Sequence, residues 1–501
     1  KNVFLAVVIL LLLLGSILRL SWFWQPSFTG DEAGHMMKAV SVTRGITDFV
    51  LNQNRRVALQ NIIKPILEHN HPPLEFLVLL PSVPFYPREF SARFIYVIIS
   101  IITLITSFYI VYKIRGKVVS LGYLGLLATS SFLVWFSQMI TFGLNLTGSV
   151  FLALGLLIFI TKPTKKSLIF LVSATVFALL VSIDFLLFVP IVTWSIYKKK
   201  SQFYSSSILK IVGVGILLLA LYYVPYIGYS FLPDSPTSAG FVHYRSYLTS
   251  DRTAQVNSFF SQGLDQFLVD KWKQFFSRAG VWTIWPWAIA TLLPLWKKRR
   301  AYTYYLWSIV ILIFILEIPV IPCCTVYLNL FGPLLLLAAE GIAILPRYPV
   351  AIIMAITIIN SIQAQPILKG IPNPITYNNW KKETDRIREI GQLIKPCLDG
   401  EETYISTEDA WRARYYFGRP MLPTVEYEMT SDEQAVEQFL RGDLPQVTII
   451  HIHVPLVSEV LINQLQIQAK HFRQIENHRI YFFKDCSAVV KTTDIPDTNR
   501  N

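Results

Sequence analysis

The chain has few charged residues. Asp, Glu, Lys and Arg together make up 15% of its 501 residues, whereas soluble domains contain about 25%. Hydrophobic residues reach 53% and aromatic residues 14%. This composition excludes a wholly soluble protein and predicts a polytopic membrane protein that carries some soluble mass.

Other features are missing as well. The four cysteines show no Cys-x-x-Cys and no Cys/His spacing, so the sequence offers no zinc motif. There is no internal repeat, and the lack of a paired inverted repeat argues against a conventional secondary transporter. The net charge of +13 would suit nucleic acid, but the basic residues fall in short clusters between apolar runs. We therefore expect no nucleic-acid partner.

Long apolar runs are what the chain does contain. A run of about 20 apolar residues spans the hydrocarbon core of a bilayer. No small-residue cleavage site follows the first run, Val3–Leu18, which favours a retained anchor over a signal peptide. We predict about eleven transmembrane helices. They lie near residues 3–24, 91–112, 118–136, 140–161, 167–182, 185–197, 208–226, 280–296, 302–320, 326–345 and 349–366.

Basic clusters between the runs test this topology. They are Lys113/Arg115/Lys117, Lys162/Lys165/Lys166, Lys198–Lys200, Lys297–Arg300 and Arg347. With this set of spans and an inside N-terminus, all of the clusters fall on one side of the membrane. Cytoplasmic loops carry an excess of Lys and Arg, so we expect an integral protein, of the plasma membrane, with its N-terminus inside. Residues 25–90, residues 227–279 and the tail from about 367 then lie outside.

Two outer segments have secondary structure of their own. Residues 256–276 carry apolar side chains at spacings of three and four, typical of an amphipathic helix. This helix either lies in the outer membrane interface or packs on the bundle. In the tail, "WKKETDRIREIGQLI" has helical periodicity, and "ETYIST", "QVTIIHIHV" and "RIYFFKD" are typical of strands.

These patterns predict a membrane domain at residues 1–366 and an extracytoplasmic α/β domain at residues 367–501. The overall class is thus a polytopic α-helical membrane protein with a C-terminal extracytoplasmic α/β domain. Cys397 and Cys486 both belong to the second domain. They either pair in an oxidising compartment or remain separate buried thiols.

The first outer segment, residues 25–90, concentrates reactive side chains. In "SFTGDEAGH", two adjacent carboxylates stand where the first helix leaves the bilayer. A carboxylate can take a proton from an acceptor hydroxyl, and a His, Lys or Arg can neutralise a departing phosphate. The mixture suits chemistry on a phosphorylated amphiphile. Its members are Asp31, Glu32, His35, Lys64, Glu68, His69, His71, Glu75, Arg88 and Glu89, with Arg93 just beyond.

Three stretches carry a family resemblance. "FTGDEAGHMMKAVSV", "NHPPLEFLVLLPSVPFYPREFSARFIYVIIS" and a helix ending in "YKIRGK" resemble the start of a GT-C glycosyltransferase. They are similar to the group that contains dolichyl-phosphate-mannose–protein mannosyltransferases and lipid A aminoarabinose transferases. "VYLNLFGPLLLLAAEGIAIL" is similar to the group's tyrosine-bearing helix near the end of the membrane domain. The resemblance covers about residues 1–345.

The resemblance implies a GT-C fold and an inverting transfer of a sugar from a polyprenyl-phosphate donor, outside the cytoplasm. Asp31 would be the general base on the acceptor, and Glu32 would support its geometry. His71 would stand near the donor phosphate, aimed by the extended turn that two following prolines fix, with Lys64 and Arg93 as helpers. The acceptor is an undetermined protein, lipid or glycan, and membrane lipids are further partners.

Other residues are candidates for the same site. Glu68, His69, His243 and Arg245 lie in the outer segments, although a solvated loop explains the last two better. Asp184 is an acid at the outer side of the membrane, where such residues are functional by default; a helix break that faces water is the competing explanation. No cofactor is required. A divalent metal is possible, because Asp31, Glu32, Glu68, His69 and His71 offer oxygen and nitrogen ligands.

Simpler roles remain open for the main candidates. Asp31 could only cap the helix that follows, and His71 could be an ordinary surface histidine. Arg93 could snorkel or pair with Glu89 one turn away. Arg19, near the outer end of the first span, is expected to snorkel.

The chain also departs from the family pattern. Many relatives carry charges where this chain has "SQMITFGLN" (residues 137–145), "SID" at Asp184 and Val326-Tyr327. Several cationic side chains that relatives carry near the donor phosphate are therefore absent. A second hypothesis stays open for this reason, namely a lipid-binding or transport protein on a degenerate GT-C scaffold.

Overall fold

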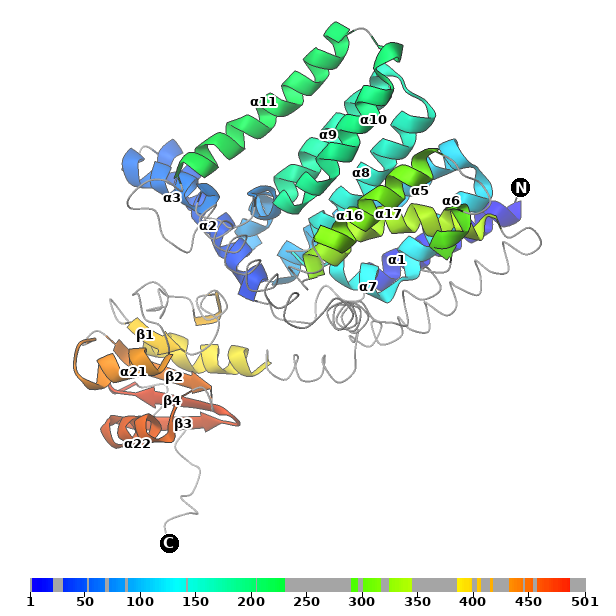
Figure 1. The fold of residues 1–501 in the computed structure, drawn as a ribbon. Coiled ribbons are helices and arrows are strands. Elements are labelled where there is room, and N and C mark those ends of the chain that lie inside the picture. Colours follow the sequence, from blue (N-terminus) through cyan, green and yellow to red (C-terminus); the bar gives the residue numbers. More distant parts are fainter. Residues whose placement is uncertain are drawn as a thin grey trace, which may run out of the picture. The chain divides into compact units, whose positions relative to one another are not determined.

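The chain divides into two compact units, each described here by itself (Figure 1). The membrane unit comprises Lys1–Gln25 and Lys38–Pro374, and the C-terminal unit comprises Pro26–Met37 and Ile375–Asn501. The computed structural model describes residues 2–20, 30–51, 54–67, 72–85, 89–140, 143–203, 205–229, 290–295, 301–316, 324–344, 385–398, 403–406, 415–417, 432–444, 447–453 and 457–486.

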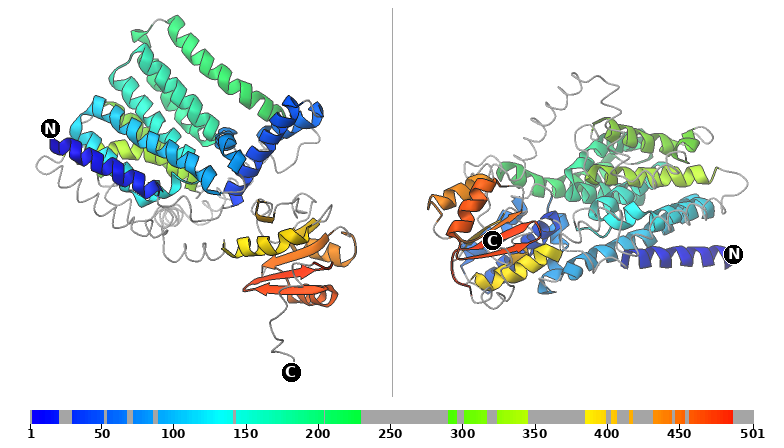
Figure 2. Two further views of the ribbon diagram at one scale, coloured as in Figure 1. Left: turned by 180° about the vertical axis from the view of Figure 1, so that it is seen from behind. Right: turned by 90° about the horizontal axis from the view of Figure 1, so that it is seen from below.

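Every described element of the membrane unit is helical (Figures 1 and 2). The long helices are α1 (Asn2–Leu20), α2 (Gly30–Val50), α3 (Arg55–Leu67), α5 (Glu89–Arg115), α6 (Lys117–Thr129), α8 (Gly143–Thr161), α9 (Lys165–Val181), α10 (Val189–Lys198), α11 (Ser205–Tyr229), α16 (Ala301–Leu316) and α17 (Cys324–Ile342). The short ones are α4 (Leu74–Leu77), η1 (Leu80–Phe85), α7 (Ser131–Phe136), η2 (Ile183–Phe188) and η3 (Lys200–Gln202).

These helices agree with the predicted polytopic class. Among the described residues, four helices are long and apolar enough to cross a membrane, namely α1, α5, α8 and α11. Helices also occur at the other predicted spans, except that residues 349–366 lie outside the described residues and 280–296 is described only at 290–295. The total of about eleven spans stays a prediction.

The core of the membrane unit is built around α8. In an 18-residue stretch of α8, 83% of the residues are buried, and this helix contacts α5, α9 and α17. In the corresponding stretch of α11, which runs beside α9 (Figure 1), only 6% of the residues are buried. Small residues let α9 approach closely, because a Cβ on Gly155 would lie 3.2 Å from the Leu171 Cα. The apolar side chains of α11 therefore face outward, as lipid-facing side chains do.

A proline explains the polar contact between α8 and α17. Pro333 has no N–H to donate to the Asn329 carbonyl, four residues earlier in α17. The Ser149 hydroxyl donates to that carbonyl at 2.6 Å and accepts from the Gly332 N–H at 2.9 Å. A Cβ on Gly332 would lie 2.1 Å from the Ser149 carbonyl oxygen, so this approach requires glycine. Ser149 thus satisfies backbone groups that lipid could not.

Arg19 is buried, so the expectation that it snorkels is wrong. Its guanidinium, fully enclosed by protein, donates to the Ser100 hydroxyl at 2.6 Å. It also donates to the carbonyls of Gly15 at 3.0 Å and Leu127 at 2.9 Å. The carbonyl of Leu127 is among the last four of α6, which have no partner within their own helix. Arg19 therefore joins α1, α5 and α6 through groups that sequence patterns do not reveal.

A second arginine joins α5 to α16 and α17. Arg115, at the end of α5, forms a bidentate pair with Glu340 of α17, with an Nη2–Oε2 distance of 2.9 Å. Its guanidinium carbon also lies 5.1 Å from the ring centroid of Tyr302 on α16. The two charged side chains are 13% and 3% exposed. This buried pair fixes the relative positions of α5 and α17.

The C-terminal unit contains a four-stranded sheet in the order β1-β2-β4-β3 (Figure 1). Strand β1 pairs in parallel with β2, whereas β4 is antiparallel to both β2 and β3. The sequence predicted β1, β2 and β4 but not the edge strand β3, "HFRQI", whose side chains are mostly half-buried. The elements are β1 (Thr403–Ser406), α21 (Asp432–Leu440), β2 (Val447–His453), α22 (Glu459–Gln468), β3 (His471–Ile475), β4 (His478–Phe482) and η5 (Lys395–Cys397).

Apolar side chains cover both faces of this sheet. One face packs Ile449, Ile480 and Phe482 against the helix at residues 385–394, and the other packs against α21 and α22. This is the three-layer arrangement of an α/β domain.

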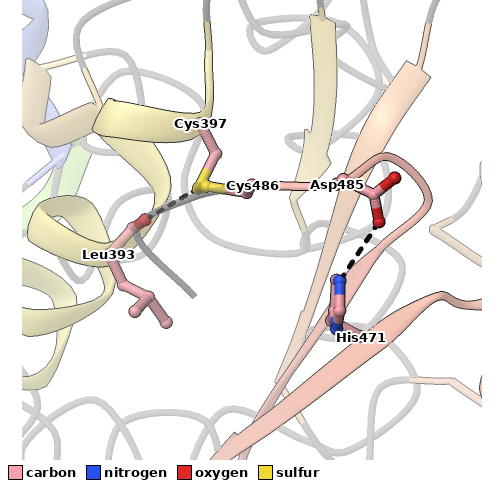
Figure 3. Close-up of a disulfide and its surroundings, with 5 residues drawn as sticks. All are labelled: Leu393, Cys397, His471, Asp485 and Cys486. Atoms are coloured by element: carbon pink, nitrogen blue, oxygen red, sulfur yellow. Dashed lines mark hydrogen bonds and ion pairs between the residues drawn. A yellow bond between two sulfur atoms is a disulfide. The ribbon is translucent and has the colours of Figure 1, made fainter. Parts of the chain in front are cut away.

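A disulfide closes the first face. Cys397 and Cys486 are bonded, with their Cα atoms 5.4 Å apart (Figure 3). Of the two alternatives that the sequence left open, the paired form is the one in the structure. A disulfide is typical of an oxidising compartment.

Candidate functional site

The segment at residues 25–90 was expected to be a long outer loop, but its described residues are largely helical. Helices α2, α3, α4 and η1 occupy it. In α2, buried residues such as Ala33, Met36 and Val40 recur at spacings of three and four, a helical pattern that the acid-rich start of the segment obscures.

The acid pair lies in the first turn of α2. This helix begins at Gly30, so Asp31 and Glu32 stand at its N-terminus, where the helix dipole favours negative charge. The Glu32 side chain is fully buried, and His35, on the next turn, is 2% exposed. The Asp31 side chain is not among the described atoms. Both carboxylates belong to the part of α2 that groups with the C-terminal unit.

The "HPPLE" motif leads directly into α4. Pro73 caps this helix in a right-handed helical conformation (φ −76°, ψ −11°) rather than in the extended turn that we expected. The first turn of α4 carries Glu75, which is 1% exposed. The Tyr96 hydroxyl on α5 donates to the Glu75 carbonyl oxygen at 2.6 Å. The motif is therefore attached to the beginning of α5, near Arg93.

Arg93 itself is 4% exposed. Its side chain is thus enclosed by protein rather than directed toward lipid headgroups, which is not what snorkelling would produce. It lies one turn before Tyr96 on α5, so both side chains project from the same face of the helix.

Three tyrosines form a cluster at the end of α11, which we call the tyrosine cluster (Tyr222, Tyr223 and Tyr226). Their ring centroids lie 4.9 Å apart for Tyr222 and Tyr223 and 5.3 Å apart for Tyr222 and Tyr226. Pro225 lies within the cluster and interrupts the helical hydrogen bonds. The Tyr223 hydroxyl donates to the Leu179 carbonyl at 2.6 Å, which attaches α11 to the end of α9.

Carboxylates lie close to this cluster. Tyr222 interacts electrostatically with Glu75, and Tyr223 interacts with Asp184. Asp184 lies in the turn η2 between α9 and α10, where the Ser182 hydroxyl donates to its Oδ2 at 3.0 Å. The structure therefore gathers α4, α5, η2 and the end of α11 into one polar region, which we call the outer cluster (Glu75, Arg93, Asp184 and the tyrosine cluster).

The sequence identified only part of this region. Arg93 and Asp184 were predicted site residues, and Lys64 is exposed in the last turn of α3, which contacts α11. Glu68, His69, His71, His243 and Arg245 lie outside the described residues, so their roles stay predictions. The tyrosine cluster was missed, although "YYVPY" at the end of an apolar helix could have indicated it.

A second polar cluster lies inside the C-terminal unit. The Ser406 hydroxyl and His451 Nδ1 are 2.9 Å apart, and His451 Nε2 and His478 Nδ1 are also 2.9 Å apart. All three residues are buried, at 3%, 0% and 0% exposed. A substrate has no access to them, so this chain of hydrogen bonds serves to satisfy buried polar atoms.

Metal binding is not indicated by the described residues. No group of three or more His, Cys, Asp or Glu side chains among them is placed to hold a metal ion. Three of the five ligands that the sequence suggested, Glu68, His69 and His71, lie outside this part of the chain.

The described helices and the C-terminal α/β unit form the fold of a polytopic helical membrane protein, which agrees with the fold that the sequence resemblance implied. The chain superposes on the crystal structure of ArnT from Cupriavidus metallidurans bound to undecaprenyl phosphate. The TM-score is 0.61 at 12% identity, covering 97% of this chain and 98% of that one. For ArnT in the apo state, the TM-score is 0.56 at 11% identity, covering 96% and 97%. No protein-family model and no curated protein matches the chain.

Proposed function

We propose that the protein is a membrane glycosyltransferase that moves a sugar from a polyprenyl-phosphate donor to an acceptor, with inversion. The observation that carries this proposal is the extent of the shared fold, since 97% of this chain superposes on 98% of an ArnT chain that binds undecaprenyl phosphate.

Asp31 is the proposed general base. It stands in the first turn of α2, where the helix N-terminus stabilises a carboxylate that can then accept the proton of an acceptor hydroxyl. Glu32, adjacent and fully buried, holds the base in position. The attack of the acceptor on the anomeric carbon breaks its bond to the donor phosphate, and a single displacement inverts the anomeric configuration.

The donor phosphate requires positive charge. Lys64, His71 and Arg93 are the proposed phosphate-binding residues, assisted by His69, His243 and Arg245 in the outer segments. Glu68 is a further proposed substrate-binding residue. Asp184 and the tyrosine hydroxyls of the outer cluster are suited to bind sugar hydroxyls, because a carboxylate accepts and a phenol both donates and accepts hydrogen bonds.

The site is proposed to lie outside the cytoplasm. The Cys397–Cys486 disulfide supports this side for the C-terminal unit, because disulfides are rare in the reducing cytoplasm. The basic clusters at the opposite helix ends support the same orientation.

Reconstituted transfer tests the proposal. The purified protein is combined in proteoliposomes with polyprenyl-phosphate sugars and with extracts of candidate protein, lipid and glycan acceptors. The wild type should transfer sugar, and the product should have the inverted anomeric configuration. Asp31→Asn should lower the rate by at least about 100-fold, the usual contribution of a general base.

Asp48→Asn is the matched control, since Asp48 lies on the same helix near its other end. It should leave transfer unchanged. Undiminished transfer by Asp31→Asn would exclude this base. Binding of the lipid phosphate without transfer from any donor would instead favour the alternative, a lipid-binding or transport protein on a GT-C scaffold.

A further inference from the structure

Helix α10 carries a shallow, open apolar groove. The groove has a volume of about 430 Å³ and is lined by Val189, Pro190, Thr193, Trp194 and Tyr197. Trp194 and Tyr197 are 52% and 54% exposed, and their rings stack with centroids 5.9 Å apart. From Val189 to Tyr197 the groove follows the helix for about 12 Å, at about 1.5 Å per residue.

Two lysines stand at the end of the groove. The Lys198 ammonium lies 4.7 Å from the Trp194 ring centroid, and the Lys200 ammonium lies 4.1 Å from that of Tyr197. These cation–π contacts hold both ammonium groups over the aromatic rings that line the groove. The sequence from Val189 to Phe203 contains no Asp or Glu, so no carboxylate of this stretch neutralises the lysines.

Further basic residues are at the same end of the bundle. Helix α9 begins at Lys165, and α10 returns after the turn η2, so the beginning of α9 and the end of α10 lie at the same level. Lys162 and Lys166 flank the beginning of α9. The groove therefore opens toward a region of positive potential at one membrane surface.

We propose that this groove binds an anionic phospholipid. One acyl chain lies along α10 against Trp194 and Tyr197, and the headgroup phosphate is bound by Lys198 and Lys200. The length of about 12 Å matches most of one leaflet, since the hydrocarbon core is about 30 Å thick in total. A negative phosphate compensates the two neighbouring ammonium groups, whereas an uncharged headgroup would leave them repelling each other. This site does not depend on the proposed transferase activity.

The experiment uses the full-length protein in nanodiscs or detergent. Phosphatidylglycerol with brominated acyl chains is added, and the quenching of tryptophan fluorescence is titrated, with brominated phosphatidylcholine as the comparison. Wild-type protein should show a saturable component for phosphatidylglycerol that disappears in Trp194→Phe. Lys198→Ala/Lys200→Ala should weaken this binding by about 20-fold, given the usual effect of two lysines at an anionic surface.

A second lysine pair provides the matched control. Lys113 and Lys117 also lie over aromatic rings, at 5.4 Å from Tyr109 and 5.5 Å from Phe4, but these rings do not line the groove. Lys113→Ala/Lys117→Ala should bind the lipid as the wild type does, and Lys198→Arg/Lys200→Arg should retain binding. Equal quenching by phosphatidylcholine, displacement by inorganic phosphate at similar concentrations, or unchanged binding by Lys198→Ala/Lys200→Ala would each overturn the proposal.

Discussion

The two units place similar ion pairs in opposite surroundings. Arg115 and Glu340 of the membrane unit are 13% and 3% exposed, whereas Lys470 and Asp485 of the C-terminal unit are 52% and 74% exposed. Both pairs include a hydrogen bond of 2.9 Å. The arginine pair is bidentate and the lysine pair has one hydrogen bond, but the larger difference lies in their surroundings.

The surroundings determine how much each ion pair contributes to the stability of its unit. Water screens an exposed pair and solvates either partner alone, so such a pair contributes little. A buried pair is different, because removing one partner leaves an uncompensated charge inside the protein. The membrane unit therefore depends on internal polar contacts such as those of Arg19 and Ser149, while the C-terminal unit relies on its sheet and a covalent link.

The largest expected effect is in the C-terminal unit. Cys397→Ala/Cys486→Ala opens a loop with a sequence separation of 89 residues and should cost about 4.5 kcal/mol by the chain-entropy estimate. Limited proteolysis with and without reductant measures it: cleavage should concentrate in the C-terminal unit. Cys323→Ala/Cys324→Ala is the control. Equal resistance of the disulfide variant and the wild type would contradict the expectation.

The buried ion pair comes next. Glu340→Gln should destabilise the membrane unit by about 3 kcal/mol, because the Arg115 charge loses its partner in a mostly buried site. Arg115→Met/Glu340→Leu should restore much of this loss, since it removes both charges. Thermal unfolding in detergent of Arg115→Met, of Glu340→Leu and of the double variant gives the coupling energy of the pair. A double variant as unstable as the sum of the single variants would exclude the pairing.

Ser149 should have a smaller effect. Ser149→Ala removes the partner of the Asn329 carbonyl that Pro333 leaves free, which should cost about 1 to 2 kcal/mol. Ser308→Ala is the control, because the Ser308 hydroxyl only donates within its own helix, to the Tyr304 carbonyl at 2.8 Å, in an exposed position. Ser149→Ala should lower the unfolding temperature in detergent more than Ser308→Ala does. Equal unfolding temperatures would show that the proline needs no compensation.

The exposed pair should have the smallest effect. The hydrogen bond from Lys470, followed by its charge, lowers the pKa of Asp485 below the ordinary 3.8. A lowered folded-state pKa contributes stability above the ordinary value, and this contribution is lost as the pH falls through the lowered pKa. Lys470→Met should therefore change the unfolding temperature only slightly at pH 7, and not at all near pH 2. A loss as large as that of Glu340→Gln would contradict the comparison between the units.

Much of the fold was predictable from local pattern. Apolar runs located α1, α5, α8 and α11 because lipid-spanning helices must be both apolar and long. The alternation of apolar and polar residues located β1, β2 and β4. Strand β3, "HFRQI", was missed because this edge strand buries too few side chains to show the alternation.

The candidate site was predictable only where chemistry and position coincide in the sequence. Asp31 and Glu32 were proposed because two acids directly follow a predicted membrane span, and Asp184 because an acid lies next to an apolar run; their roles stay predictions. Glu75 was named only as one of many reactive residues of its segment, and the tyrosine cluster was missed, because their positions depend on contacts between segments far apart, such as that of Tyr96 with the Glu75 carbonyl.

The sequence by itself determined which segments are apolar enough to cross a membrane and which segment near the C-terminus is polar enough to form an α/β unit, because both depend on the affinity of each segment for lipid or water. Only the tertiary structure decided that Arg19 is buried, that Cys397 and Cys486 are joined, and that Ser149 compensates Pro333. In each case the interacting residues lie far apart along the chain. Local hydropathy shows that a polar side chain in an apolar segment needs a bonding partner, but it does not show which residue that partner is.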